Sequence, residues 1–225
     1  TLPLASPVLE LQRLRQRIVG RCKDGSVLPL KHVDGRWRTV PIELGHPVST
    51  MAGSGLDGSV YWAGEDGVLH RWRPSGEERT VASMEKHRVL RIRPLEQGAR
   101  IAAQGSDNVI RVLDAATGEI LSRLEGHTRA PDSIVMKAGS HRLISAGGFE
   151  MKLIIWDPRL QENLLSVRLP AASFDMALSP DGDKLLCGLM WGHVLLCDMA
   201  PTDRPLTLTK AARGVEIDHT HPRSR

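Results

Sequence analysis

The chain has 225 residues, of which 41% are hydrophobic and 25% are charged, a composition typical of a globular protein with a sizeable core. No run of about 18 apolar residues occurs, so the sequence predicts no membrane-spanning helix and no membrane partner. Three cysteines without metal-ligand spacing argue against a disulfide framework and a zinc site, and indicate a reducing, cytoplasmic location.

A turn followed by an apolar strand recurs five times along the chain, each time over seven positions. These segments begin at Asp24, Asp66, Asp107, Glu150 and Trp191. Their last residues lie at positions 30, 72, 113, 156 and 197, so the intervals are 42, 41, 43 and 41 residues. That period is typical of a four-stranded blade in an all-β propeller.

Each segment is preceded by an apolar stretch that ends in small residues, which predicts a hairpin of a second and a third strand. A second turn and another strand follow. We therefore expect five blades of four antiparallel strands and almost no helix. The third strands are predicted near 26–30, 68–72, 109–113, 152–156 and 193–197. The predicted propeller spans 1–218, with blades at 8–45, 46–86, 87–126, 127–170 and 171–210, and a basic tail at 219–225.

A second pattern gives the same period. His46, His87 and His127 stand 41 and 40 residues apart, and two of them follow a glycine. With the pair Trp156-Asp157, these residues resemble the WD-repeat family, in which a Gly-His pair precedes the first strand of a blade and a Trp-Asp pair ends the third. The resemblance covers residues 8–210 and implies a β-propeller.

The resemblance also implies a hydrogen-bonded network within a blade, made of a histidine, a hydroxyl, an acid and the tryptophan. The second repeat lacks a hydroxyl at the expected place, and the fourth carries glutamate where the family has aspartate. The matching residues are His127, Ser145, Glu150 and Trp156 in the fourth repeat and His46, Asp66 and Trp72 in the second.

Five blades in an open row would leave exposed sheet edges, which propellers avoid by closing into a ring of four to eight blades. Seven is the usual number in the family that the chain resembles. We expect the five blades either to close on themselves or to be completed by sequence outside this chain or by a partner chain. The segment Gly214–Asp218 is interpreted as the first strand of a sixth blade or as a closing strand.

No nucleophile with a base in reach, no paired carboxylates and no phosphate-binding glycine loop stand out, so the sequence predicts no enzyme, no cofactor and no metal site. Cys187 and Cys197 are expected to face each other across a hairpin. Because Cys197 takes the core tryptophan position, small buried apolar side chains are favoured over a redox pair.

Two large aromatic residues, Phe149 and Trp191, fall at the tips of predicted turns, where a chain reversal alone favours Gly, Asn or Asp. Exposed aromatics on a rigid frame are typical anchors of a binding surface, although each could instead fold back over its own blade. Polar candidates on the same predicted face are Arg88, Asn108, Arg129 and Asp132.

The function predicted from these features is a non-catalytic scaffold, or a sensor or docking module, that binds proteins as part of a larger multidomain or multisubunit assembly. The alternative is a nucleic-acid or other polyanion binder, because the net charge is +4 and the pI is about 9.2. Arginines that alternate along predicted strands would serve that alternative. They are Arg13, Arg15, Arg17, Arg91 and Arg93.

Overall fold

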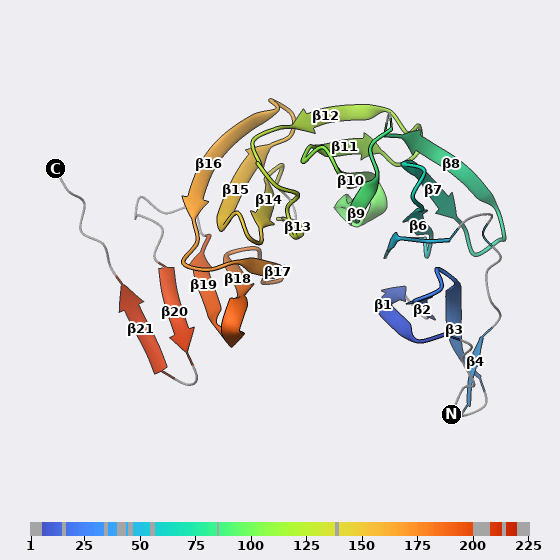
Figure 1. Ribbon diagram of the computed structural model, residues 1–225, viewed down its shortest axis with the longest axis horizontal. Coiled ribbons are helices and arrows are strands. Elements are labelled where there is room, and N and C mark those ends of the chain that lie inside the picture. Colours follow the sequence, from blue (N-terminus) through green and yellow to red (C-terminus); the bar gives the residue numbers. More distant parts are fainter. Residues whose placement is uncertain are drawn as a thin grey trace. The chain divides into compact units, whose positions relative to one another are not determined.

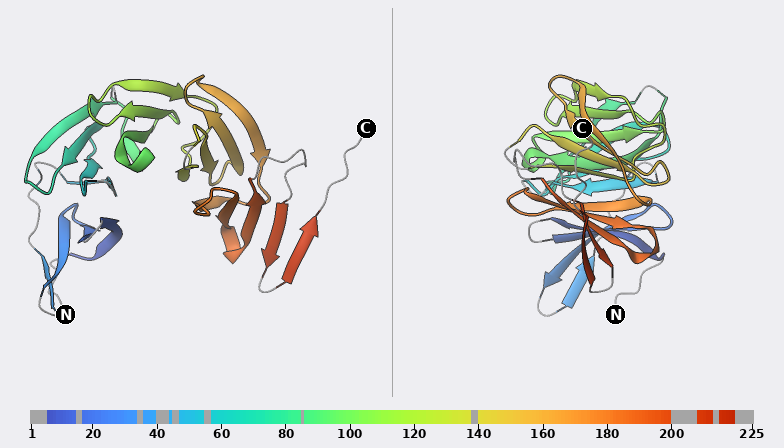
Figure 2. Two further views of the ribbon diagram at one scale, coloured as in Figure 1. Left: turned by 180° about the vertical axis from the view of Figure 1, so that it is seen from behind. Right: turned by 90° about the vertical axis from the view of Figure 1, so that its left-hand side faces the viewer.

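The computed structural model describes residues 6–14, 17–33, 36–39, 44, 47–54, 57–84, 86–137, 140–199, 208–212 and 215–219 (Figure 1). The chain divides into two compact units, Thr1–Leu121 and Ser122–Arg225. Each unit is built from antiparallel sheets in which strands that follow one another in the sequence are hydrogen-bonded neighbours (Figures 1 and 2).

The first unit holds sheets 1 to 3, each of four strands. Sheet 1 consists of β1 (Val8–Leu14), β2 (Arg17–Cys22), β3 (Val27–Val33) and β4 (Arg36–Thr39). Sheet 2 consists of β5 (Thr50–Gly53), β6 (Val60–Ala63), β7 (Val68–Trp72) and β8 (Glu78–Ser83). Sheet 3 consists of β9 (Val89–Leu95), β10 (Arg100–Gly105), β11 (Ile110–Asp114) and β12 (Ile120–Leu124), and β12 runs across the boundary between the units.

The second unit holds sheets 4 and 5. Sheet 4 consists of β13 (Ser133–Met136), β14 (Leu143–Gly147), β15 (Lys152–Asp157) and β16 (Glu162–Arg168). Sheet 5 consists of β17 (Ser173–Leu178), β18 (Lys184–Leu189), β19 (Val194–Asp198), β20 (Leu208–Ala212) and β21 (Val215–His219).

Apolar side chains on alternate strand positions join neighbouring sheets into cores, because successive residues of a strand point to opposite faces. In the second unit, Leu185 and Cys187 of β18 pack in one cluster with Ile144 and Ile155 of sheet 4. In the first unit, one cluster joins sheets 1 and 2 and another joins sheets 2 and 3. Each core is therefore a contact between two blades.

The predicted fold class is confirmed: the protein is all-β and has five antiparallel blades with the β-propeller architecture. The third strands lie where the period placed them, at β3, β7, β11, β15 and β19. The described helical segments are two 3-10 turns of three residues each, η1 (Glu96–Gly98) and η2 (Met190–Gly192).

One expectation is wrong. The segment that includes Val215–His219 was predicted to begin a sixth blade or to close the propeller, but β21 pairs with β20 and extends sheet 5 to five strands. The alternation Val215, Ile217 and His219 marks a strand without indicating which strand it joins, and the short connection from β20 favours a hairpin.

Candidate functional site

The polar network of sheet 4 ties a loop, two strands and a turn together. The Nδ1 atom of His127 lies 2.8 Å from Oε2 of Glu150, and its Nε2 atom lies 2.6 Å from Oγ of Ser145. The indole N–H of Trp156 donates to the same Ser145 oxygen at 2.8 Å. The structure thus brings together all four residues that the fourth repeat suggested.

The chemistry of the network fixes the state of the histidine. Burial lowers the pKa of His127 more than its hydrogen bond to Glu150 raises it, so the ring is neutral at pH 7. Burial raises the pKa of Glu150, but hydrogen bonds from His127 and the Thr128 amide outweigh burial and lower it overall. A neutral ring with its proton on Nδ1 donates to Glu150 and accepts the Ser145 hydroxyl, so every polar group has a partner.

The second repeat is built differently. His46 lies outside the described residues. Asp66 accepts the Val68 amide in a hairpin turn, and Trp72 is a half-buried side chain packed against the core between sheets 1 and 2. The place of the missing hydroxyl is taken by Trp62, which is fully buried and stacks on His70 with ring centroids 4.1 Å apart.

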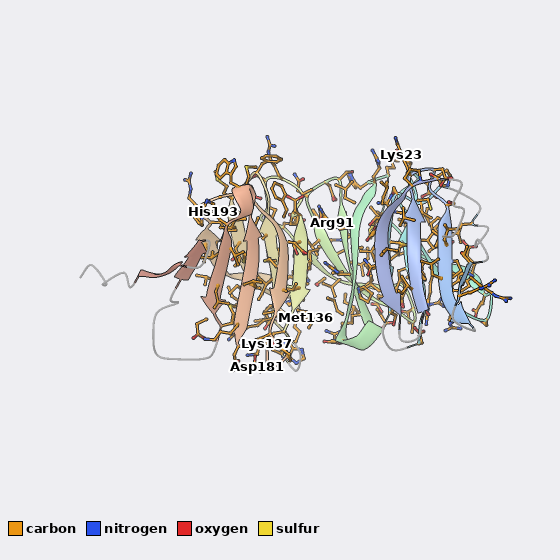
Figure 3. All side chains as sticks on the ribbon, turned by 90° about the horizontal axis from the view of Figure 1, so that it is seen from below. Lys23, Arg91, Met136, Lys137, Asp181 and His193 are labelled. Atoms are coloured by element: carbon orange, nitrogen blue, oxygen red, sulfur yellow. The ribbon has the colours of Figure 1, made fainter. Side chains whose placement is uncertain are left out.

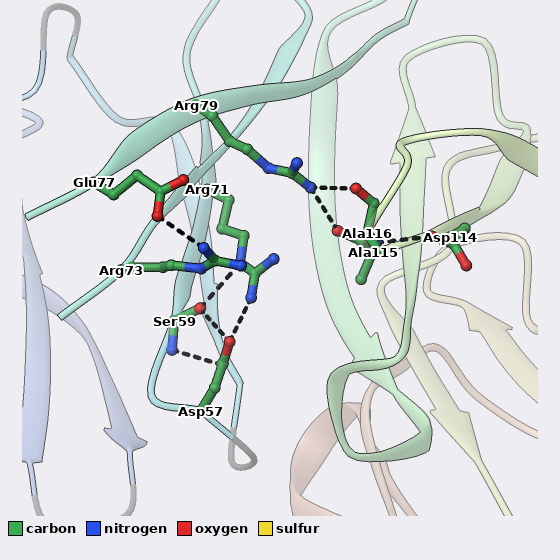
Figure 4. Close-up of polar contacts among 9 residues, drawn as sticks. All are labelled: Asp57, Ser59, Arg71, Arg73, Glu77, Arg79, Asp114, Ala115 and Ala116. Carbon is green, nitrogen blue, oxygen red and sulfur yellow. Dashed lines mark hydrogen bonds and ion pairs between the residues drawn. The ribbon is translucent and has the colours of Figure 1, made fainter. Parts of the chain in front are cut away.

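Another polar cluster of the first unit was not foreseen from the sequence. Asp57, in the loop between β5 and β6, forms an ion pair with Arg71 of β7 and accepts the hydroxyl of Ser59 at 2.7 Å (Figure 4). Arg71 also donates to Ser59 at 3.0 Å. Burial raises the pKa of Asp57, but these hydrogen bonds lower it far more, so Asp57 is ionised. The cluster therefore links the loop before β6 to β7 through charged hydrogen bonds within sheet 2.

Two of the polar surface candidates belong to the first unit. Arg88 is exposed and forms an ion pair with Glu65, which lies in the hairpin turn of sheet 2. Asn108 lies in the hairpin turn of sheet 3 with a left-handed backbone (φ 66°), a conformation that asparagine tolerates better than most residues. A turn role therefore explains Asn108 without a ligand.

The arginines of the polyanion alternative are only partly described. The side chains of Arg13, Arg15 and Arg17 lie outside the described residues. Arg91 is exposed on β9 (Figure 3) and Arg93 is half-buried, and both take part in interactions within the protein. No described arginine cluster therefore favours a polyanion site over an ordinary polar surface.

The exposed aromatic residues lie in the second unit. Phe149, in the hairpin turn of sheet 4, is 65% exposed, and Phe174 of β17 is 42% exposed. Their rings meet edge to face with centroids 5.7 Å apart, a favourable geometry for an aromatic pair. Both phenylalanines of the chain are thus exposed and in contact with each other, across two neighbouring sheets.

Trp191 lies in η2, the turn between β18 and β19 of sheet 5, two residues before His193 in the sequence. Figure 3 labels His193 at one end of the second unit and Lys137 and Asp181 at the opposite end. Trp191 is 78% exposed and has a left-handed backbone (φ 63°, ψ 23°). The Met190 amide donates to the Ala172 carbonyl at 2.8 Å, which anchors the turn to the segment leading into β17. We call Phe149, Phe174 and Trp191 the aromatic surface.

Asp132 holds the turn that carries Phe149. Its Oδ2 atom accepts the Gly148 amide at 2.7 Å. A Cβ atom on Gly148 would lie 2.1 Å from that oxygen and 3.1 Å from the Phe174 ring, so glycine is required for this close approach. Arg129 is exposed on the loop that precedes β13. The four candidates of the second unit therefore lie on one pair of sheets, whereas Arg88 and Asn108 belong to the other unit.

Phe174 was missed by the sequence reasoning because a β-bulge redirects it. β17 pairs Ser173 with Leu189 and Asp175 with Gly188, which leaves Phe174 as an extra residue without a partner. Extra residues stand at the same place in β1 and β9, at Leu9 and Leu90, and both are exposed. The only signal in the sequence is that this residue is one of the two phenylalanines of the chain.

Metal binding and cysteine chemistry are the other kinds of chemistry that concern the described residues. No group of three or more His, Cys, Asp or Glu side chains in that part of the chain could hold a metal ion. Cys187 and Cys197 are both buried and free, and the hydrogen bond between them together with burial raises the pKa of Cys187. No helix of the described residues is long and apolar enough to cross a membrane.

Comparison with known proteins supports a WD40-type propeller. No family model matches the chain. Subunit I of eukaryotic translation initiation factor 3 from Candida albicans is 26% identical over 148 residues, which are 64% of this chain and 40% of that protein. The match thus spans about two fifths of the length of this curated relative.

Solved structures show the same fold. The WD40 propeller domain of Doa1 superimposes with a TM-score of 0.73 and 11% identity, over 97% of this chain and 83% of that one. The computationally designed Ika8 protein superimposes with a TM-score of 0.68 and 17% identity, over 84% of this chain and 57% of that one.

Proposed function

We propose that the protein is a non-catalytic interaction scaffold within a larger assembly, and that the aromatic surface of the second unit binds a protein partner. The observation that carries the proposal is the exposure of Phe149, Phe174 and Trp191 at 65%, 42% and 78%. Monomeric proteins bury aromatic side chains where they can, and exposed aromatics on a rigid frame are the usual anchors of binding hot spots.

Hydrogen bonds hold the frame of this surface. Asp132 and Met190 anchor the two turns through hydrogen bonds, and the network of His127, Ser145 and Trp156 lies in the same blade as Phe149. Anchors that are ordered before binding lose little conformational freedom on binding. The name of the relative, a subunit of a translation initiation factor, supports a place in an assembly but not a particular partner.

The proposal is tested by retention of partners from an extract of the source cells on the immobilised chain. A Phe149→Ser/Trp191→Ser variant is expected to lose proteins that the unmodified chain retains. The matched control is Leu164→Ser/Leu165→Ser, which also removes two exposed apolar side chains, 46% and 38% exposed, but from β16. Equal retention by all three chains would exclude the aromatic surface as the binding site.

Salt dependence separates the proposal from polyanion binding. Contacts to phosphates weaken by orders of magnitude between about 50 and 200 mM salt, whereas apolar contacts do not. We expect retention to survive this change. Loss of binding with salt, together with a normal Phe149→Ser/Trp191→Ser variant, would favour the polyanion alternative.

A further inference from the structure

The phenylalanine pair of the aromatic surface lies beside two carboxylates. A Cβ atom on Gly148 would lie 2.1 Å from Oδ2 of Asp132 and 3.1 Å from the Phe174 ring, so this carboxylate and the ring edge are close neighbours across the turn. Asp175 follows Phe174 directly, is exposed, and accepts the Ser133 hydroxyl at 3.4 Å through Oδ1. Since Ser133 follows Asp132, the start of β13 and the bulge of β17 hold both carboxylates next to the pair.

Backbone amides fix the positions of both acids. Asp132 accepts the Gly148 amide at 2.7 Å, and Asp175 accepts the Met176 amide at 2.9 Å. An ionised carboxylate has about four acceptor positions, and these hydrogen bonds orient it without removing its charge. The pair is therefore bordered by negative charge in a fixed arrangement.

The basic side chains of this region are few. Lys152 is the basic residue nearest to Phe149 in the sequence, but its Nζ atom donates to the Gly126 carbonyl at 2.9 Å and lies 3.8 Å from Glu150. Arg129 is exposed and is the one arginine or lysine of the loop 125–132. A phosphate would meet two carboxylates at the rings, so these charges disfavour a polyanion at the aromatic surface.

Aromatic rings beside carboxylates fit a cation that is also planar. The face of an aromatic ring attracts a cation, and an edge-to-face pair leaves ring faces open. A guanidinium stacks on such faces and donates to carboxylates through two N–H groups at once, whereas an ammonium is a compact and strongly hydrated charge.

We infer that Phe149 and Phe174, together with Asp132 and Asp175, bind an arginine side chain of the protein partner. The inference rests on the proposed function and adds the chemistry that the partner presents. All four residues belong to the second unit and lie on a turn, at a bulge or at the strand end beside it. The site therefore does not use the strand faces through which the blades pack on one another.

The test uses the full chain with ¹³C-labelled phenylalanine rings. Since the chain has two phenylalanines and both lie at the site, every ring signal reports on it. The probe is the peptide acetyl-Ala-Arg-Ala-amide, titrated to tens of millimolar. The matched peptide carries citrulline, which keeps the shape of the side chain and replaces the guanidinium by a neutral urea. We expect both ring signals to shift with the arginine peptide and to shift little with the citrulline peptide.

Conservative variants test the carboxylates. Asp132→Asn and Asp175→Asn each remove a charge and keep an oxygen that accepts the same backbone amide. Each should weaken binding of the arginine peptide about two- to fivefold, as for the loss of one exposed ion pair. Asp181→Asn is the control, because Asp181 is an exposed acid in the turn after β17, at the far end of that strand from Phe174. It should bind the peptide as the unmodified chain does.

Several results would overturn the inference. The ring signals could stay unchanged with the arginine peptide or move equally with the citrulline peptide. A lysine peptide could bind more tightly than the arginine peptide, which would exclude selection of a guanidinium. Asp181→Asn could weaken binding as much as the other two variants, which would reduce their effect to net charge. Arg129→Gln removes the cation of the neighbouring loop and should bind the peptide at least as well, so weaker binding would contradict a site made by the acids.

Retention from the cell extract separates this inference from the proposed function. We expect Asp132→Asn/Asp175→Asn to lose the same proteins that Phe149→Ser/Trp191→Ser loses. If only the aromatic variant loses them, the aromatic surface binds a partner without an arginine contact, and the inference alone fails. If both variants retain every protein, the proposed function fails and the inference fails with it.

Discussion

Ser145→Ala removes one oxygen atom from the centre of the polar network in sheet 4. The Ser145 hydroxyl is the partner of both His127 Nε2 and the Trp156 indole N–H, at 2.6 and 2.8 Å. The change hardly alters side-chain volume, so packing is preserved. Two buried polar atoms lose their partner instead, because Ser145 is fully buried.

The magnitude follows from those two atoms. Each buried donor or acceptor without a partner costs about 1–3 kcal/mol, so the free energy of unfolding of the second unit should fall by roughly 2–6 kcal/mol. That loss is a large part of the stability of about 5–15 kcal/mol that a typical domain has. A substitution of one atom should therefore act like the loss of a core side chain.

The assay is urea unfolding followed by circular dichroism, with hydrogen exchange of β14 and β15 to report on the second unit alone. The control is Ser166→Ala, an exposed serine that accepts a hydrogen bond from Asn163 at 2.8 Å, and its effect should stay within about 0.5 kcal/mol. If Ser145→Ala were as mild as the control, the network would not stabilise the blade and the reasoning would be refuted.

Two further predictions concern the same blade. Trp156→Ala should lower the free energy of unfolding by about 3–5 kcal/mol, as for a large buried aromatic, and an unchanged melting temperature would contradict its place in the core. Stability should also fall on acidification in two steps. Folding lowers the pKa of His127 from its ordinary value of 6.5, so below pH 6.5 the unfolded chain binds a proton at this ring more readily than the folded chain does, and stability falls. Folding also lowers the pKa of Glu150 from its ordinary value of 4.5, so a second fall in stability is expected below pH 4.5. His127→Gln should remove the first step in a pH series of melting curves, and a first step that persisted would assign it to another group.

The fold could be predicted from the sequence because its signals are local and repeated. Turn residues such as Asp66 and Asn108 stand at a fixed distance before apolar strands, and the strand period of two follows from backbone geometry alone. The strand with which the segment Val215–His219 pairs is not determined by local sequence. Val215–His219 reads as a strand in any sheet, so its place beside β20 could not be predicted.

The candidate surface was predicted in part. Phe149 and Trp191 were found because aromatics are unusual at turn tips. Phe174 escaped because regular alternation in β17 would put it on the same face as Met176, which is 5% exposed; the bulge reverses that direction. The pairing of Asp57 with Arg71 also escaped, since the two residues are 14 positions apart on different elements.

At the bulge in β1, β9 and β17, the residues that pair within the sheet differ from the residue that is exposed on the surface. The neighbouring residues maintain the sheet, so the extra residue contributes no ladder pair and its side chain faces solvent. Leucine occupies it in two sheets and phenylalanine in the third. A substitution there alters what the surface presents while leaving the blade intact. Substitutions at Leu9, Leu90 and Phe174 are therefore expected to change the exposed surface of the protein with little effect on its folding.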